Sequence, residues 1–195
     1  MPRKTRQESP TGIYHWMSRG YLKRDIFRSR PDFDKFLGLV QEYSPKHQIA
    51  VYHYCLMNNH LHFLVKAPTI KDLTLFSHFV KRRYAYYYSK TYRHAGATFE
   101  KRFNAIPVTD ERYLLECGRY IERNPVRAGI VKHPADYAYS SSRYYLRGEL
   151  SCILSPSPAY LAISEDPDTR RALYEQYVTE TRPQEEYAEN KALAF

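Results

Sequence analysis

The sequence predicts an α+β fold in which a four-stranded antiparallel sheet carries helices, in the chain order βαββαβ with one further helix. Three observations lead to this prediction. Residues 12–20 alternate in side-chain character with the period of two that a strand requires. Residues 32–47 repeat apolar side chains every three or four positions, which is typical of an amphipathic helix. Asn58 and Asn59 separate two apolar runs, and asparagine tolerates the positive φ of a hairpin turn.

The middle of the chain continues the alternation of strands and helices. Two strands flank the asparagine turn, a long helix follows them, and an extended segment then returns to the sheet. Their expected bounds are residues 49–55 and 60–66 for the strands, 71–92 for the helix and 98–108 for the extended segment. This order fits a ferredoxin-like antiparallel sheet, in which the first and third strands lie at the centre.

A third helix follows the extended segment. Thr109 or Asp110 can cap its start, and Asn124 marks its end because a residue that precedes proline avoids the α region. On this helix Glu116, Tyr120 and Asn124 lie on one i, i+4 row. The row presents a phenol and a carboxamide to the same point, although a packing tyrosine and a helix C-cap would give the same pattern.

Length and composition indicate one main domain with an appendage. The chain has 195 residues, of which 43% are hydrophobic, and this is enough for one sizeable core. We expect residues 1–150 to form the domain and residues 151–195, which begin near a linker at residues 155–158, to form a tail. Three cysteines without a CxxC pair, and the lack of an apolar run of about 18 residues, favour a protein of the reducing cytoplasm.

Charge is distributed unevenly along the chain. Residues 1–150 carry 26 Lys+Arg against 13 Asp+Glu, whereas residues 151–195 carry 4 against 8. A basic domain attracts polyanions, and nucleic acid is the commonest such partner. The 20 tyrosines and 9 phenylalanines point the same way where they alternate with basic residues, because aromatic rings beside cations bind single strands. A merely basic surface and aromatic core packing are the alternatives.

The triplet His60-Leu61-His62 is the most informative chemical signal in the chain. Residues i and i+2 of a strand point to the same face about 6.6 Å apart, so that both imidazoles could bind one metal ion. The alternative is a pair of partly exposed strand histidines that bind nothing.

Several separated motifs together resemble a known family. Three of them are the strand of His60 and His62, residues 99–103 (FEKRF) and residues 120–131 (YIERNPVRAGIV). Two N-terminal segments, residues 14–20 (YHWMSRG) and 25–27 (DIF), also agree with that family. In this order, over residues 12–145, the chain closely resembles the REP-associated tyrosine transposases, an IS200-like branch of the single-strand HUH transposases. The resemblance implies that residues 1–150 form the catalytic domain.

The resemblance also implies a reaction. In the family a tyrosine on a helix, here Tyr120, attacks a phosphodiester of single-stranded DNA and leaves a 5′-phosphotyrosine and a free 3′-hydroxyl. Phenol has a pKa of about 10 and water one of about 15.7, so phenolate leaves phosphorus more easily than hydroxide does. The DNA can therefore be rejoined without ATP. Tyr113 is the second choice as nucleophile.

By the same resemblance the metal ligands are His60, His62 and Asn124. Two imidazole nitrogens and one amide oxygen suit a loosely held Mg²⁺ or Mn²⁺. Glu116 is the second choice as the third ligand, and a C-cap role is the alternative for Asn124.

The implied partner is single-stranded or hairpin DNA. Family members act on hairpins of repetitive extragenic palindromes and cut near a short unpaired tetranucleotide. We expect a nucleoid-associated monomer, with a dimer as the alternative. The basic residues expected to contact DNA, each of which could instead be a solvated surface charge, are Arg19, Lys23, Arg24, Lys81, Arg82, Arg83, Lys101 and Arg102.

Two other functions are compatible with parts of the pattern. A DNA-hairpin-binding protein of the same fold could lack cleavage activity, and a ferredoxin-like RNA-binding domain could use the aromatic residues as stacking platforms. The RNA-binding interpretation leaves the two histidines and Tyr120 without a shared role. The acidic tail has two interpretations as well: it competes with DNA near the active site, or its helix at residues 168–178 covers part of the core.

Overall fold

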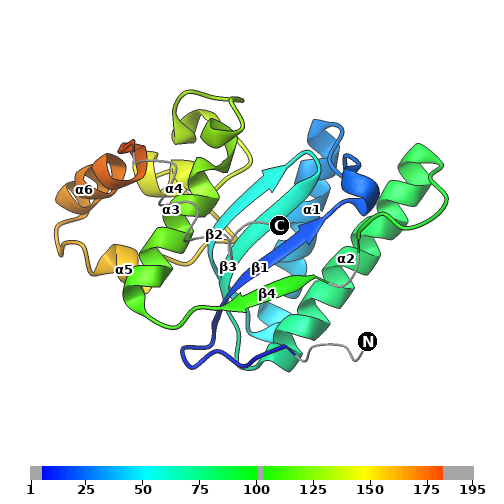
Figure 1. The fold of residues 1–195 in the computed structure, drawn as a ribbon, viewed down its shortest axis with the longest axis horizontal. Coiled ribbons are helices and arrows are strands. Elements are labelled where there is room, and N and C mark those ends of the chain that lie inside the picture. Colours follow the sequence, from blue (N-terminus) through cyan, green and yellow to red (C-terminus); the bar gives the residue numbers. More distant parts are fainter. Residues whose placement is uncertain (1–5, 101–102, 182–195) are drawn as a thin grey trace.

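A four-stranded antiparallel sheet forms the centre of the molecule (Figure 1). The structure, a computed structural model, describes residues 6–100 and 103–181. The strand order is β2-β3-β1-β4, so β1 and β3 are central, as predicted. The strands are β1 (Ile13–Arg19), β2 (Ala50–Met57), β3 (His60–Lys66) and β4 (Asn104–Pro107).

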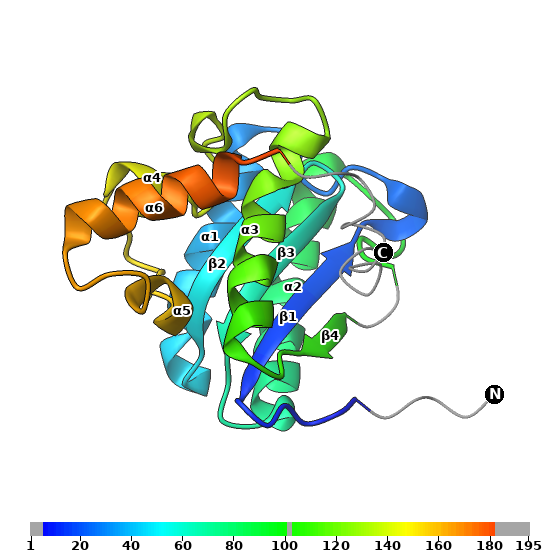
Figure 2. The same cartoon turned by 60° about the vertical axis from the view of Figure 1, so that its left-hand side comes forward.

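Helices cover both faces of this sheet. Helices α1 and α2 pack on one face, and α3 crosses the other (Figures 1 and 2). Three shorter helices, α4 to α6, follow α3 and pack beside it. The helices are α1 (Arg30–Tyr43), α2 (Ile70–Tyr92), α3 (Glu111–Arg127), α4 (Ser142–Arg147), α5 (Pro158–Leu161) and α6 (Pro167–Thr179), with 3₁₀ turns at Tyr21–Lys23, Pro45–His47 and Pro134–Asp136.

The alternation of β3 sends its side chains into two different layers. Leu61, Phe63 and Val65 are buried in the larger core, together with α1 and α2. Leu64 is buried in the core beneath α3, and by the period of two His60 and His62 face the same side. The two histidines therefore lie between the sheet and the layer of α3.

Most elements agree with the sequence-based bounds, with local differences. The predicted helix 32–47 is divided, because Ser44 ends α1 and a 3₁₀ turn follows at Pro45. The predicted extended segment 98–108 contributes only its last part to the sheet as β4, while Phe99 forms an isolated bridge with Gly20. In the described part of the chain, no helix is long and apolar enough to span a bilayer.

The prediction that the third helix ends at Asn124 is wrong. Helix α3 continues through Pro125 to Arg127, and Ala128 is its C-cap. Proline cannot donate the hydrogen bond that the Ile121 carbonyl would otherwise receive in the helix. The side-chain amide of Asn124 donates to that carbonyl at 3.3 Å and to the Tyr120 carbonyl at 2.8 Å, which compensates for the missing donor.

Candidate active site

Three histidines gather on the face of the sheet that α3 covers. Antiparallel pairing of β1 with β3 brings His15 beside His62, where Nε2 of His15 and Nδ1 of His62 are 2.9 Å apart. The rings of His60 and His62 have their centroids 5.1 Å apart. Nδ1 of His60 lies 2.6 Å from Oδ1 of Asn59, in the hairpin turn. Each of the two predicted histidine ligands thus has a neighbour within hydrogen-bond distance of its Nδ1.

Burial keeps these imidazoles neutral. It lowers the pKa of His15 to about 3. Burial, together with the positive charge of Arg19, lowers the pKa of His60 to about 4. The pKa of His62 is well below its usual value, first because of burial and then because of its charged and imidazole neighbours. Neutral imidazole is the form that can bind a metal ion.

Tyr120 projects from α3 onto this histidine cluster. Its ring centroid is 5.6 Å from that of His62 and 6.0 Å from that of His15, and the side chain is only 7% exposed. The guanidinium carbon of Arg127, almost two turns further along α3, lies 5.0 Å from the Tyr120 ring centroid. Burial raises the pKa of Tyr120, while the charge of Arg127 and its hydrogen bond oppose that rise.

Asn124 follows Tyr120 by one helical turn and is half-buried. Its side-chain nitrogen donates to the helix backbone, so the side-chain oxygen is the atom that could bind a cation. Its predicted alternative role as a C-cap is wrong, because α3 continues beyond it. Glu116, the second choice as ligand, is also half-buried on α3.

The residues present fit a loosely held divalent cation. Among the described residues, no group of three or more His, Cys, Asp or Glu side chains could hold a metal ion. The predicted donors are the imidazoles of His60 and His62 and the amide of Asn124, a set that suits a weakly bound, oxygen-preferring ion. Their roles as ligands stay a prediction.

The predicted DNA-contacting residues fall into separate places. Arg19 is the register partner of His60. Lys23 and Arg24 are exposed in the loop after β1, and that loop is tied to the hairpin turn because Gly20 N donates to Asn59 O at 2.8 Å. These three lie at the His60 end of the sheet. Lys81, Arg82 and Arg83 lie on α2, across the sheet, and Lys101 and Arg102 lie outside the described residues.

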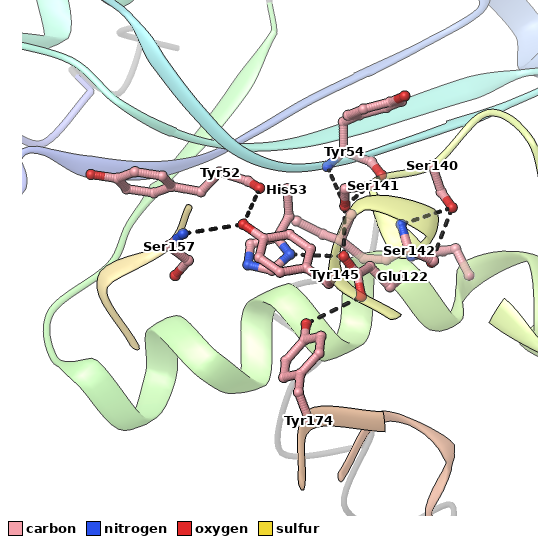
Figure 3. A network of polar contacts seen from close by, with 12 residues as sticks. Tyr52, His53, Tyr54, Glu122, Ser140, Ser141, Ser142, Tyr145, Ser157 and Tyr174 are labelled. Carbon is pink, nitrogen blue, oxygen red and sulfur yellow. Dashed lines mark hydrogen bonds and ion pairs between the residues drawn. The ribbon is translucent and has the colours of Figure 1, made fainter. Parts of the chain in front are cut away.

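A buried polar network anchors α3 through Glu122 (Figure 3). Glu122 is fully buried, and its carboxylate accepts from Ser141 Oγ at 2.7 Å and from His53 Nδ1 at 2.9 Å. Its second oxygen accepts from the Tyr174 hydroxyl at 3.1 Å. The network joins α3 to β2, to the segment before α4 and to α6, so it constrains the rotation of the helix that carries Tyr120.

Two arginines of α3 cap the end of α6. Nε of Arg119 donates to the Tyr177 carbonyl at 2.9 Å, and Nη1 of Arg123 donates to the Val178 carbonyl at 2.7 Å. Cations at a helix C-terminus satisfy its last carbonyls and its dipole. Tyr174 and Val178 are fully buried, so α6 covers part of the core, as the second interpretation of the tail expected. Residues 182–195 lie outside the described residues.

Sequence reasoning missed three residues of this region. His15 alternates correctly on its strand, but only the pairing of β1 with β3 places it at His62. Arg127 lies beyond the predicted end of the third helix. Glu122 is one of many acidic residues in the sequence, and only its burial distinguishes it.

Known proteins support the fold and the family. A family model described as "Transposase IS200 like" matches residues 9–124. Among solved structures, a REP-associated tyrosine transposase bound to a REP hairpin has 14% sequence identity and a TM-score of 0.62, over 80% of this chain and 93% of that chain. A proposed transposase from Deinococcus radiodurans has 14% identity and a TM-score of 0.41, over 63% of this chain and 95% of that chain. No curated protein matches.

The first of these structures confirms the predicted α+β fold, since its alignment covers nearly the whole of that protein. The family match includes β1 to β4, both predicted histidine ligands and the part of α3 that carries Tyr120. Because this match spans more than half of the chain, the protein belongs to the family of IS200-like transposases.

Proposed function

We propose that this transposase cleaves and rejoins single-stranded DNA next to a hairpin, with Tyr120 as the nucleophile. One observation carries the proposal: Tyr120 is held in ring contact with His62 and beneath the guanidinium of Arg127. A hairpin is the substrate because the structural relative is a REP-associated transposase bound to a REP hairpin.

The proposed reaction exchanges one phosphate ester for another. Oη of Tyr120, as the phenolate, bonds to phosphorus, and the bond from phosphorus to the 3′ oxygen of the preceding nucleotide breaks. The departing 3′ oxygen takes up one proton, which balances the proton that the phenol has released. The products are a 5′-phosphotyrosine and a 3′-hydroxyl. The reverse attack by a 3′-hydroxyl restores a phosphodiester and releases the tyrosine.

The chain's own residues prepare this exchange. Arg127 stabilises negative charge on the phenol and, because it is exposed, can also contact a DNA phosphate. Arg19 adds a second positive charge at the His60 end of the site. His60, His62 and Asn124 would hold Mg²⁺ or Mn²⁺, which when bound would polarise a non-bridging phosphate oxygen.

The test is covalent capture of DNA by the protein. A hairpin oligonucleotide labelled at its 3′ end is incubated with Mn²⁺, and the label is followed on a denaturing gel. The labelled fragment should migrate with the protein, because the 5′ phosphate of that fragment is attached to tyrosine. Tyr120→Phe should abolish the adduct, and Tyr113→Phe is the matched control that should retain it.

The same assay addresses the non-cleaving alternative. Hairpin binding by the wild-type protein without any adduct, with either metal, would favour a DNA-hairpin-binding protein over an endonuclease. An adduct that persists in Tyr120→Phe would contradict the assignment of the nucleophile.

A further inference from the structure

A cavity of about 430 Å³ lies on the side of α2 that faces the N-terminal segment. Its wall includes Arg6, Ser77 and Lys81, with Phe103 just before β4. It is separate from the histidine cluster, which lies on the opposite face of the sheet. Its volume is within the range of small-ligand sites, which begins at about 300 Å³.

The cavity is positively charged. Arg6, Lys81 and Arg82 line it, and none of the described residues that line it is acidic. The Lys81 ammonium lies 4.7 Å from the centroid of the Phe99 ring. Burial and the charge of Arg6 lower the pKa of Lys81 to about 8. A bound anion would offset the repulsion between these cations, so the cavity favours a phosphate.

The cavity also offers a flat surface for stacking. The guanidinium carbon of Arg6 is 3.8 Å from the centroid of the Phe103 ring. Nη2 of Arg6 donates to the Phe103 carbonyl at 3.2 Å, which keeps the guanidinium on the ring. A guanidinium supported in this way can receive a nucleobase on its outer face.

A buried hydroxyl completes the lining. Ser77 is fully buried on α2, and its Oγ has no hydrogen-bond partner among the described residues. Such a group is costly unless something binds it. A base edge or a phosphate oxygen in the cavity would supply the missing partner.

The edge of the sheet connects this cavity with the candidate active site. Phe99, which Lys81 contacts, bridges to Gly20, the residue after Arg19. Glu100 N donates to the Arg19 carbonyl at 2.8 Å. The Phe99 segment therefore lies between Arg19, at the His60 end of the site, and Lys81, at the cavity.

From these observations we infer that the cavity of Arg6, Ser77 and Lys81 binds one nucleotide of the unpaired strand that flanks the hairpin. This inference rests on the proposed function. The base of the bound nucleotide stacks on Arg6, and the phosphate of that nucleotide lies between Lys81 and Arg82. Lys81 and Arg83, which the sequence presented as equivalent phosphate contacts, then have different roles: Nε of Arg83 donates to the Tyr43 hydroxyl at 3.3 Å, toward α1 and outside the cavity.

The experiment compares a blunt hairpin with hairpins that carry unpaired nucleotides on one side, in the Tyr120→Phe background, which prevents cleavage. Fluorescence anisotropy measures the affinity of a blunt hairpin and of the same hairpin with four unpaired nucleotides on its 5′ or 3′ side. Lys81→Gln should weaken the binding of the hairpin flanked on one side, 5′ or 3′, about tenfold. The affinity for the blunt hairpin should stay almost unchanged. Ser77→Ala should act in the same direction by a few-fold, and Lys81→Arg should restore affinity.

Arg83→Gln is the matched control, because it removes one positive charge at the second position after Lys81 on the same helix. It should lower both affinities slightly and equally, as a general charge effect does. Equal losses in Lys81→Gln and Arg83→Gln, for both DNAs, would overturn the inference. If the wild-type protein forms the covalent adduct, these equal losses overturn only the nucleotide site and not the proposed function. If no adduct forms with any hairpin, the proposed function itself fails.

Discussion

Two opposing influences act on the pKa of the Tyr120 phenol. Burial between α3 and the sheet raises its pKa, so that a neutral phenol is favoured. Arg127 opposes this effect through its charge and a hydrogen bond, and its guanidinium lies over the ring. In the proposed reaction the phenolate attacks phosphorus, so Arg127 would favour the phenolate form that burial disfavours.

Replacing Arg127 with alanine should therefore move the pH dependence of adduct formation upward. Without the cation the pKa of Tyr120 rises further, and the fraction of phenolate at pH 7 falls by about tenfold for each pKa unit. Rates of adduct formation from pH 6 to 10 would measure this. Arg127→Lys keeps the charge and should restore most of the rate. A lower rate with an unchanged pH profile would instead assign Arg127 to DNA contact alone.

His15 lies against a predicted metal ligand, His62. If His62 binds a metal through Nε2, its Nδ1 must carry the proton and donate to Nε2 of His15, 2.9 Å away. His15→Leu removes this acceptor, and we expect Mn²⁺ affinity to fall about tenfold or more. Titration of the protein with Mn²⁺, followed by electron paramagnetic resonance, gives the affinity without any activity measurement. An unchanged Mn²⁺ affinity in a folded variant would contradict the role of His15.

At the scale of elements, α3 shows how a side chain can override a local rule. The Asn-Pro pair predicted a helix end, but the Asn124 amide satisfies the carbonyl that Pro125 leaves unbonded. The extra turn is what brings Arg127 over Tyr120. The bounds of β1, β2 and β3 were predicted to within two residues, whereas the fourth strand was predicted too long.

The contact of α3 with α6 and β2 depends on Glu122, whose carboxylate is shared by His53, Ser141 and Tyr174. Glu122→Gln places an amide among these donors, and it should cost about 2–4 kcal/mol of the free energy of unfolding. Tyr174→Phe should cost about 1 kcal/mol. Urea unfolding, followed by the fluorescence of the single tryptophan, Trp16, would measure both.

The two substitutions should not be additive, because they affect the same network. Tyr144→Phe is the matched control: Tyr144 is half-buried near α6, and its hydroxyl forms no hydrogen bond among the described residues. Loss of the Tyr144 hydroxyl should leave the free energy of unfolding almost unchanged. Simple additivity of Glu122→Gln and Tyr174→Phe would mean that the two groups stabilise the fold independently.

Across the whole molecule, residues on both sides of position 150 share one buried cluster. Tyr174 and Val178 of α6 are fully buried in one cluster with Tyr145 and Leu146 of α4. The acidic segment after residue 150 therefore includes part of the structural support of α3.

Two truncations separate this support from any competition with DNA. A chain ending at residue 150 loses α5 and α6, and its Tm should fall by about 10 °C or more because buried Tyr174 and Val178 are removed. A chain ending at residue 181 keeps every described helix, and its Tm should not change. Calorimetry measures both. An increase in adduct formation by the chain that ends at residue 181 would assign inhibition to residues 182–195. No increase would leave those residues without an inhibitory role.

The order of the elements, the shared face of His60 and His62, and the common row of Tyr120 and Asn124 follow from the amino-acid sequence alone. These are local properties, because the strand and helix periods depend only on neighbouring residues. The fold, in contrast, places His15 against His62 and α3 over the histidine face, and it separates the contacts of Lys81 from those of Arg83. Each of these depends on contacts between segments that are remote in the chain, and such contacts follow from packing rather than from any local pattern.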